Sequence, residues 1–176
     1  ILGGLLKPSK GNILVNDLDL YNSSEKQRCQ HINKHIGFVF QDYQLLENLN
    51  VIDNICLPAH LKHNYSWSLH KYKYINRAKE LLEHFNLMNR LTYFPNELSG
   101  GELQRIAIIR ALINNPDIIL CDEPTGNLDS NNAKEFINII LSLKKKFKTT
   151  FVIVSHSTTI VDNADHIFKI SVGVIK

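Results

Sequence analysis

The sequence is poor in cysteine and has no long apolar segment. Its three cysteines, Cys29, Cys56 and Cys121, are odd in number and lack the spacing of metal ligands, which is typical of a reducing, cytosolic protein without disulfides. The nearest candidate for a membrane span, Ile106–Ile113, is interrupted by Arg110 and is much shorter than the roughly 20 apolar residues that a span requires. Any role at a membrane is therefore expected to go through a partner.

The sequence also has a small net charge and a single methionine. A formal net charge of +3 over 176 residues does not favour nucleic-acid binding. Met88 is the only methionine and the chain begins at Ile1, so we expect the sequence to be part of a longer protein. The apolar residues of Ile1–Leu6 are predicted to end a helix, which Lys7 and Pro8 stop. The length and the ordinary apolar fraction predict one α/β domain with a sizeable core.

Strands and helices are predicted to alternate in the first and last parts of the chain. The expected strands lie within residues 11–20 and at 36–40, 117–121, 149–154, 166–170 and 174–175, and the expected helices at 23–34, 131–146 and 158–161. Such alternation predicts an α/β fold with a doubly wound, mostly parallel sheet.

The middle of the chain differs, because its apolar positions follow helical spacing. Helices are expected from Asn50 to near Pro58, over residues 69–85, and from Ser99 onward. We therefore predict that a sheet-containing core carries an inserted α-helical subdomain. The core comprises residues 1–41 and 116–176, and the subdomain comprises residues 42–115.

Polar side chains that can do chemistry end three of the predicted strands. They are Gln41, the adjacent carboxylates Asp122 and Glu123, and His156. Because the carboxyl ends of parallel strands lie along one edge of a sheet, we expect these side chains to converge there. Each alone has a simpler interpretation, as a cap, a loop residue or a structural hydrogen-bond partner. The prediction of a site therefore depends on their convergence.

A second segment, Leu98–Glu102, supplies backbone donors. Ser99 and Glu102 have the spacing of a capping box, and Gly100 and Gly101 would present bare N–H groups to a phosphate at the start of a helix. Together, the two features predict chemistry on a nucleoside triphosphate. No glycine in the sequence is followed by lysine, however, so the Gly-rich loop ending in Gly-Lys-Ser/Thr is missing.

The residue types suggest how such a site would work. A triphosphate reacts as its Mg²⁺ complex, for which Asp122 and Gln41 are suitable ligands. Successive side chains of a strand alternate, so Glu123 points elsewhere and can polarise the attacking water, which Gln41 can also orient. His156 can donate a hydrogen bond to a γ-phosphate oxygen.

These residues resemble the ATP-binding subunits of ABC transporters. Leu98–Glu102 is similar to the signature sequence of that family, and Ile118–Glu123 resembles Walker B with its catalytic glutamate. Gln41 stands at the position of the Q-loop, and His156 at that of the switch histidine. Gly126–Asp129 looks like the D-loop. Within the family, the chain most resembles the branch that contains lipoprotein-release and macrolide-export ATPases.

The resemblance implies a P-loop NTPase-like fold and an ATPase, with ATP as substrate and Mg²⁺ as cofactor. Two such domains, here a homodimer, pair head to tail, so that Ser99, Gly100, Gly101 and Glu102 act on the partner's nucleotide and Asp129 contacts the opposite subunit. The helical block meets integral membrane permease subunits at the cytoplasmic face of the inner membrane, and no nucleic acid is expected as a partner. The implied function couples ATP hydrolysis to export or to translocation of lipoproteins, peptides or drugs.

The sequence departs from the family pattern in three places. Walker A and the aromatic residue that precedes it are absent, Ser157 stands where many relatives have aspartate, and Val172–Val174 replaces a common Asp-Gly turn. Two alternatives stay open: a non-transport ABC ATPase, and a catalytically incompetent fragment that lacks Walker A. The sequence shows neither the coiled-coil insertion nor the tandem cassette that is usual in the first alternative.

Three groups of conspicuous side chains are interpreted as structural. The histidines lack the further ligands of a metal site, and the lysines suit the C-terminal end of a solvated helix. The aromatic residues are expected to pack around the helical subdomain, with a partner contact as the alternative. These groups are His31, His35, His60, His63 and His70; Lys144, Lys145, Lys146 and Lys148; and Tyr65, Trp67, Tyr72 and Tyr74.

Overall fold

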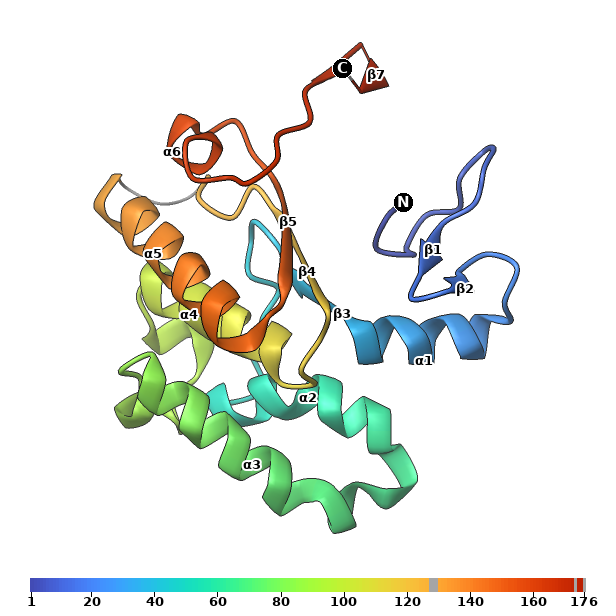
Figure 1. The fold of residues 1–176 in the computed structure, drawn as a ribbon. Coiled ribbons are helices and arrows are strands. Elements are labelled where there is room, and N and C mark those ends of the chain that lie inside the picture. The colour runs from blue at the N-terminus through green and yellow to red at the C-terminus, as the bar shows by residue number, and fades with distance from the viewer. Residues whose placement is uncertain (127–129, 173, 176) are drawn as a thin grey trace.

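The computed structural model describes residues 1–126, 130–172 and 174–175. Short 3₁₀ helices cover Asn64–Ser66, Met88–Arg90 and Pro95–Glu97. The described ranges include no helix that is long and apolar enough to cross a lipid bilayer. The strands and α-helices follow in the order β1 (Leu14–Val15), β2 (Leu18–Asp19), α1 (Glu25–His35), β3 (Ile36–Val39), α2 (Val51–His63), α3 (Trp67–His84), α4 (Gly100–Leu112), β4 (Ile118–Asp122), α5 (Ser130–Phe147), β5 (Thr150–Val154), α6 (Thr158–Val161), β6 (Ile170–Ser171) and β7 (Val174–Ile175) (Figure 1).

The centre of the fold is a three-stranded parallel sheet with the order β3-β4-β5. Ile36 of β3 pairs with Ile118 of β4, which in turn pairs with Thr150 of β5. Because the three strands run in the same direction, their carboxyl ends share one edge of the sheet (Figure 1). The loops that follow these strands therefore begin side by side.

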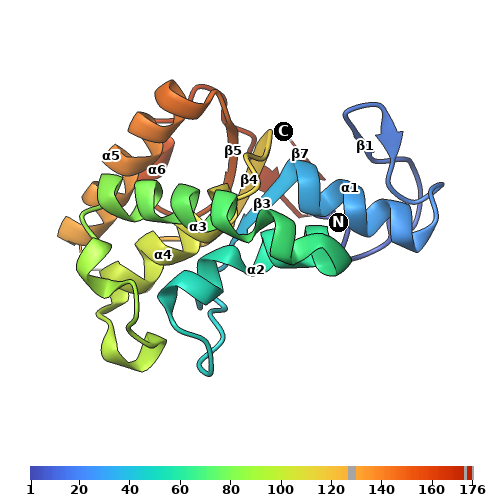
Figure 2. The same ribbon diagram turned by 90° about the horizontal axis from the view of Figure 1, so that it is seen from below.

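One face of the sheet packs against α4 and α5, and α2 and α3 lie beyond α4 in the same buried cluster (Figure 2). Ile119 and Cys121 of β4 belong to this cluster together with Phe136 of α5. Gly37 permits a very close approach of α4, because an added Cβ would lie 2.6 Å from the backbone carbonyl oxygen of Ala111. Helices and sheet thus share a core, and the division into two subdomains stays a prediction.

The opposite face of the sheet is covered less completely. Around β3 and β4 it packs against α1 and the β1–β2 hairpin, where Val15, Leu20 and Ile36 are buried. At β5, the side chains of Val152 and Val154 are 38% and 58% exposed. This face is therefore open along β5.

Local sequence signals account for most of the elements. Ser24 caps α1 and Ser99 caps α4, each in a capping box with the residue three positions later. Ala78 and Leu82 lie on the buried face of α3, at the spacing that the sequence indicates. The predictions confirmed to within two residues at each end are the strands at 36–40, 117–121, 149–154 and 174–175, and the helices at 23–34, 69–85, 131–146 and 158–161.

Helix α2 is longer than predicted. The side chain of Asn50 accepts a hydrogen bond from the N–H of Asp53 at 2.9 Å, as expected for a helix start. The end predicted near Pro58 is wrong, because the helix continues for another turn. Proline removes one helical hydrogen bond, but its carbonyl accepts one from the side chain of Asn33 at 3.0 Å, and the next residue, Ala59, is fully buried.

The helical end predicted at Ile1–Leu6 is wrong. The N–H of Gly4 donates to the carbonyl of Ile1 at 2.9 Å and closes a turn. Gly4 has a φ of +72°, which is incompatible with a right-handed helix. Leu5 and Leu6 are 69% and 67% exposed, so burial offers little to stabilise a helix here.

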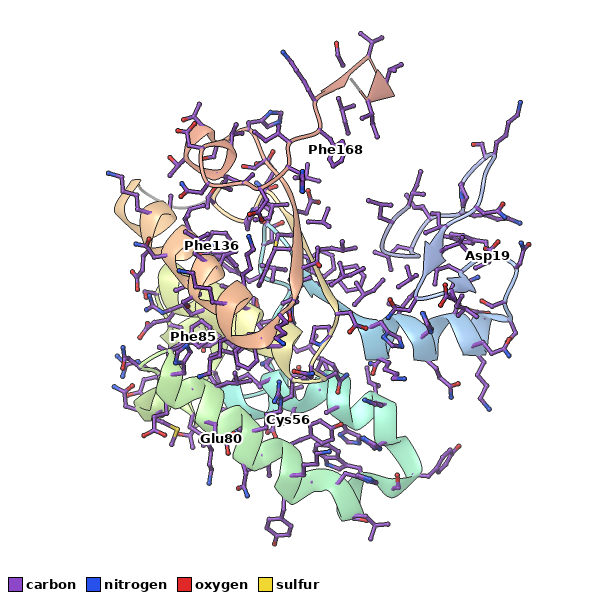
Figure 3. All side chains as sticks on the ribbon, viewed as in Figure 1. Asp19, Cys56, Glu80, Phe85, Phe136 and Phe168 are labelled. Carbon is purple, nitrogen blue, oxygen red and sulfur yellow. The ribbon has the colours of Figure 1, made fainter. Side chains whose placement is uncertain are left out.

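Two predicted strands also differ from the structure. Residues 11–20 form a hairpin, because Asn16 and Asp17 adopt φ values of +45° and +64° and turn the chain between β1 and β2. The strand predicted at 166–170 is wrong over most of its length, since β6 begins only at Ile170 and pairs with β7. Phe168, which precedes it, is 74% exposed (Figure 3), so this apolar run is not a buried strand.

Candidate functional site

The loops that follow β3, β4 and β5 come together at the carboxyl edge of the sheet. Asp122 ends β4 opposite Val154 of β5, and the N–H of Glu123 donates to the Val154 carbonyl at 2.9 Å. From the β3 side, Gln41 approaches Gly126 so closely that a Cβ added to this glycine would lie 3.3 Å from the Gln41 Nε2 atom. The structure therefore gathers these strand-end residues, as the sequence predicts.

His156 joins this group through Glu123. Its Nε2 atom lies 3.3 Å from Oε1 of Glu123, and the hydroxyl of Ser155 donates to Oε2 at 3.3 Å. The side chain of Glu123 is 24% exposed, whereas that of His156 is 99% exposed. The Ser155 hydroxyl oxygen also accepts the N–H of Ser157 at 3.1 Å, just before α6. The loop after β5 thus holds the carboxylate and leaves the imidazole accessible to a ligand.

Glu123 has a backbone conformation that is uncommon for residues other than glycine. Its φ is +41°, and its carbonyl accepts the N–H of Gly126 at 3.0 Å, which closes a tight turn. Within this turn, the carbonyl of Pro124 accepts a hydrogen bond from the buried side chain of Gln104 on α4. Conformations of this kind concentrate at functional sites, where surrounding structure enforces them.

Helix α4 starts with a complete capping box. The N–H and the hydroxyl of Ser99 both donate to Oε2 of Glu102 at 2.9 Å, and the N–H of Glu102 donates to the Ser99 hydroxyl oxygen at 3.4 Å. Arg90 donates from Nε to Oε1 of Glu102 at 2.8 Å. The Ser99 N–H and the Arg90 guanidinium together lower the pKa of Glu102 to about 2. The helix start is therefore fixed by an ionised carboxylate.

Gly100 and Gly101 form the first turn of α4. The first backbone N–H groups of a helix have no acceptor within the helix, and the Ser99 hydroxyl oxygen accepts the one from Glu102. A Cβ added to Gly100 would lie 3.6 Å from the hydroxyl oxygen of Tyr43, so the loop after β3 comes near this turn. Backbone donors of this kind suit phosphate oxygens, as the sequence predicts.

Arg110 has a role at this site that was not predicted from the sequence. This buried side chain donates from Nη2 to the carbonyl of Tyr43 at 2.6 Å, and from Nη1 to the carbonyl of Gln44. Both loop residues have positive φ values, +58° and +50°. Burial lowers the pKa of Arg110 to about 10, so the side chain stays cationic at neutral pH. The available signal was a lone arginine within the apolar run Ile106–Ile113.

Asn54 is a second residue whose role was not predicted from the sequence. Its side chain is fully buried and donates to the carbonyls of Leu46, Leu49 and Asn50 at 3.0, 2.8 and 3.1 Å. Its amide oxygen accepts the N–H of Leu46 at 2.8 Å. One amide thus organises the end of the loop that leads from Gln41 to α2. A polar residue inside an apolar helix was the signal for it.

Asp122 and Gln41 present oxygen atoms of the kind that Mg²⁺ accepts as ligands. Both side chains are exposed, one at the end of β4 and the other in the loop after β3. Across the described part of the chain, no three His, Cys, Asp or Glu side chains are grouped as a metal site. In triphosphate sites, Mg²⁺ takes one or two carboxylates and completes its shell with phosphate oxygens and water, so this small donor set fits it.

The remaining predictions have different outcomes. Asp129, predicted to contact an opposite subunit, lies outside the described residues.

The aromatic residues of the helical region differ in their packing. Tyr74 is buried and Trp67 packs against the core, as expected. The packing expected for Tyr65 and Tyr72 is wrong, because these side chains are 101% and 79% exposed at the junction of α2 and α3, outside the buried face of either helix.

Residues 1–126 match the family model described as ABC transporter. The chain is 38% identical over 176 residues to the lipoprotein-releasing system ATP-binding protein LolD of Colwellia psychrerythraea, with 100% of this chain and 66% of that protein covered. It is 40% identical over 176 residues to the LolD protein of Cytophaga hutchinsonii, with 99% and 78% covered. The chain thus spans about two thirds of the first of these relatives and about three quarters of the second.

Solved structures show the same likeness. The chain superposes with a TM-score of 0.82 on the ATP-binding cassette MJ0796, determined as a dimer in a post-hydrolysis state bound to ADP and Pi. The two sequences are 30% identical, and the superposition covers 99% of this chain and 75% of that one. The predicted α/β class with a parallel sheet is thereby confirmed.

Proposed function

The chain belongs to the ABC transporter family, and from this premise we propose that it is the ATP-binding subunit of a transporter that couples ATP hydrolysis to lipoprotein release. The names of the two LolD relatives support the cargo. The observation that carries the ATPase assignment is the 3.3 Å approach of His156 to Glu123, at the edge where Asp122 and Gln41 also lie.

We propose that the strand-end residues act together on ATP. Asp122 and Gln41 would hold Mg²⁺, which neutralises negative charge on the phosphates when it is bound. The Glu123 carboxylate polarises a water and accepts its proton as the water oxygen bonds to the γ-phosphorus and the bond to the ADP oxygen breaks. His156 donates a hydrogen bond to a γ-phosphate oxygen, for which its exposed imidazole is suited.

We propose that the start of α4 acts on a different ATP molecule, the one bound to a second copy of the chain. Gly100 and Gly101 offer backbone N–H groups, and the Ser99–Glu102 capping box keeps the helix start rigid. Ser99 is part of this surface and Asp129 would contact the opposite subunit. The dimeric state of the MJ0796 cassette supports pairing of two such subunits.

We propose that the loop after β3 passes the state of the nucleotide to integral membrane subunits at the cytoplasmic face of the inner membrane. This loop begins at Gln41, within the proposed ATP site. It is clamped by Arg110 on α4 and by Asn54 on α2. A movement at Gln41 is therefore transmitted to two helices of the region 42–115.

A catalytically incompetent fragment is the second candidate. One observation favours it: no Gly-Lys-Ser/Thr loop occurs in these 176 residues, although such a loop usually binds the triphosphate. ATP hydrolysis by the 176-residue chain, assembled with the membrane subunits, separates the two candidates. Steady phosphate release supports the ATPase, and its absence supports the incompetent fragment.

Copurification tests the transport assignment against a non-transport ABC ATPase. The protein is isolated through an affinity tag from detergent-solubilised membranes at its native expression level. We expect integral membrane subunits to copurify with it. Recovery of DNA or ribosomes in their place would contradict the transport assignment.

A further inference from the structure

The junction of α2 and α3 carries four large apolar or aromatic side chains that are exposed to solvent. Leu61, Tyr65, Leu69 and Tyr72 are 66%, 101%, 83% and 79% exposed. The junction projects at the outer end of the helix pair (Figures 1 and 2). Large side chains grouped in this way on one corner of a protein indicate a surface for a partner.

The same junction is basic. Residues 54–79 contain no aspartate or glutamate, and Lys62, Lys71, Lys73 and Lys79 in this segment are exposed. The pKa of Lys62 is lowered, first by partial desolvation of its side chain and then by the charges of Lys34 and Lys73. Ammonium groups thus crowd together in a stretch without acidic residues. A negatively charged surface is the complement of this arrangement.

Contacts between aromatic rings hold the junction together. His60 of α2 stacks on Trp67 of α3, with ring centroids 4.9 Å apart, and His63 stacks on His70 with centroids 3.9 Å apart. The His63 Nε2 atom also lies 3.0 Å from the hydroxyl oxygen of Tyr74. These contacts hold α2 and α3 together. Figure 3 labels Cys56 on α2 and Glu80 on α3. The exposed side chains therefore project from two helices that are already packed together.

We propose that this corner, comprising Leu61, Lys62, Tyr65, Leu69, Lys71, Tyr72 and Lys73, binds the surface of an anionic lipid bilayer. The leucine and tyrosine side chains enter the interfacial layer, where tyrosine is favoured, and the lysines contact lipid phosphates. A bilayer accepts projecting side chains without a matching groove, which suits a convex corner. The contact requires neither ATP nor membrane subunits, so it adds direct lipid binding to the proposed function.

Flotation with lipid vesicles tests this proposal. The purified chain is mixed with vesicles of phosphatidylcholine alone or with added phosphatidylglycerol. We expect binding to the anionic vesicles, weakened by salt. The double variants Leu69→Ser/Tyr72→Ser and Lys71→Gln/Lys73→Gln should each lower the partition coefficient roughly tenfold or more. Circular dichroism establishes that each variant is folded.

Matched controls are available elsewhere on the surface. Leu14 is 67% exposed on β1 and Lys26 is exposed on α1, so Leu14→Ser and Lys26→Gln should bind vesicles like the wild type. Equal binding to neutral and anionic vesicles, or no binding to either, would overturn the proposal. Corner variants that keep vesicle binding but lose the membrane subunits would also overturn it, since the corner would then be a protein contact. ATP hydrolysis is not measured, so failure here is distinguishable from failure of the ATPase assignment.

Discussion

The Nε2 atom of His156 lies 3.3 Å from the Oε1 atom of Glu123, at the edge where β4 and β5 end. The carboxylate is held by the Ser155 hydroxyl, and the Glu123 N–H donates to Val154. The imidazole is almost wholly exposed. A fixed carboxylate beside an accessible donor suits water activation next to a phosphate oxygen.

Substitution of His156 by alanine is expected to reduce hydrolysis while sparing ATP binding. Loss of one hydrogen-bond donor to a transition state lowers turnover by about 10²–10³-fold. Phosphate release by the transporter in proteoliposomes measures turnover, and binding of a fluorescent ATP analogue measures affinity. His166→Ala, at another exposed histidine, is the control. Hydrolysis at the wild-type rate would show that His156 does not contact the reacting phosphate.

Glu102 is expected to make stability depend on pH in the acid range. Its pKa is about 2 in the folded protein against an ordinary value of 4.5. Because the folded-state value is lowered, the ionised carboxylate stabilises the fold above the unfolded pKa, and this contribution is lost as pH falls from about 4.5 toward about 2. The Tm difference between wild type and Glu102→Gln should therefore shrink between about pH 7 and about pH 3.

Thermal unfolding followed by circular dichroism measures this difference. Glu80→Gln, an exposed carboxylate on α3, provides the control and should leave the Tm almost unchanged at each pH. A Tm difference for Glu102→Gln that stays constant over the same pH range would contradict the assignment of the low pKa to Glu102.

Arg110 is expected to stabilise the loop after β3. Arg110→Met removes the donors to the carbonyls of Tyr43 and Gln44 and should lower the free energy of unfolding by about 2–4 kcal/mol, because two hydrogen bonds from a charged donor are lost. Lys26→Met removes an exposed cation from α1 and should cost little. Urea unfolding monitored by fluorescence compares the two. Equal stabilities would mean that the guanidinium does not hold the loop.

The central sheet was predictable because β3, β4 and β5 are apolar runs bounded by polar residues. The errors have physical causes. At Ile1–Leu6 the apolar pattern suggests a helix, but Gly4 adopts a positive φ and the leucines stay exposed. At Pro58 the local rule against proline is outweighed by burial of the next residue and by the hydrogen bond from Asn33. The difference between the two cases is burial, which is lacking at Leu5 and Leu6 and complete at Ala59.

The candidate site was predictable to the extent that topology determines it. Parallel strands bring Gln41, Asp122 and His156 to one edge even though they are distant in sequence. The contacts of Arg110 and Asn54 were not predictable, because they bind backbone carbonyls of a loop whose path has no sequence pattern. A lone polar residue in an apolar helix marks such a position without identifying its acceptor.

The Glu123→Gln variant tests the central claim most directly. ATP hydrolysis is measured in proteoliposomes that contain the gene product and its membrane subunits, and ATP-driven pairing is measured by cross-linking. The glutamine variant should lose at least about 100-fold in turnover while pairing persists, because the amide cannot accept the proton of the attacking water. Glu80→Gln should behave as wild type. Unchanged turnover in Glu123→Gln would contradict the assignment of Glu123 as the group that activates water.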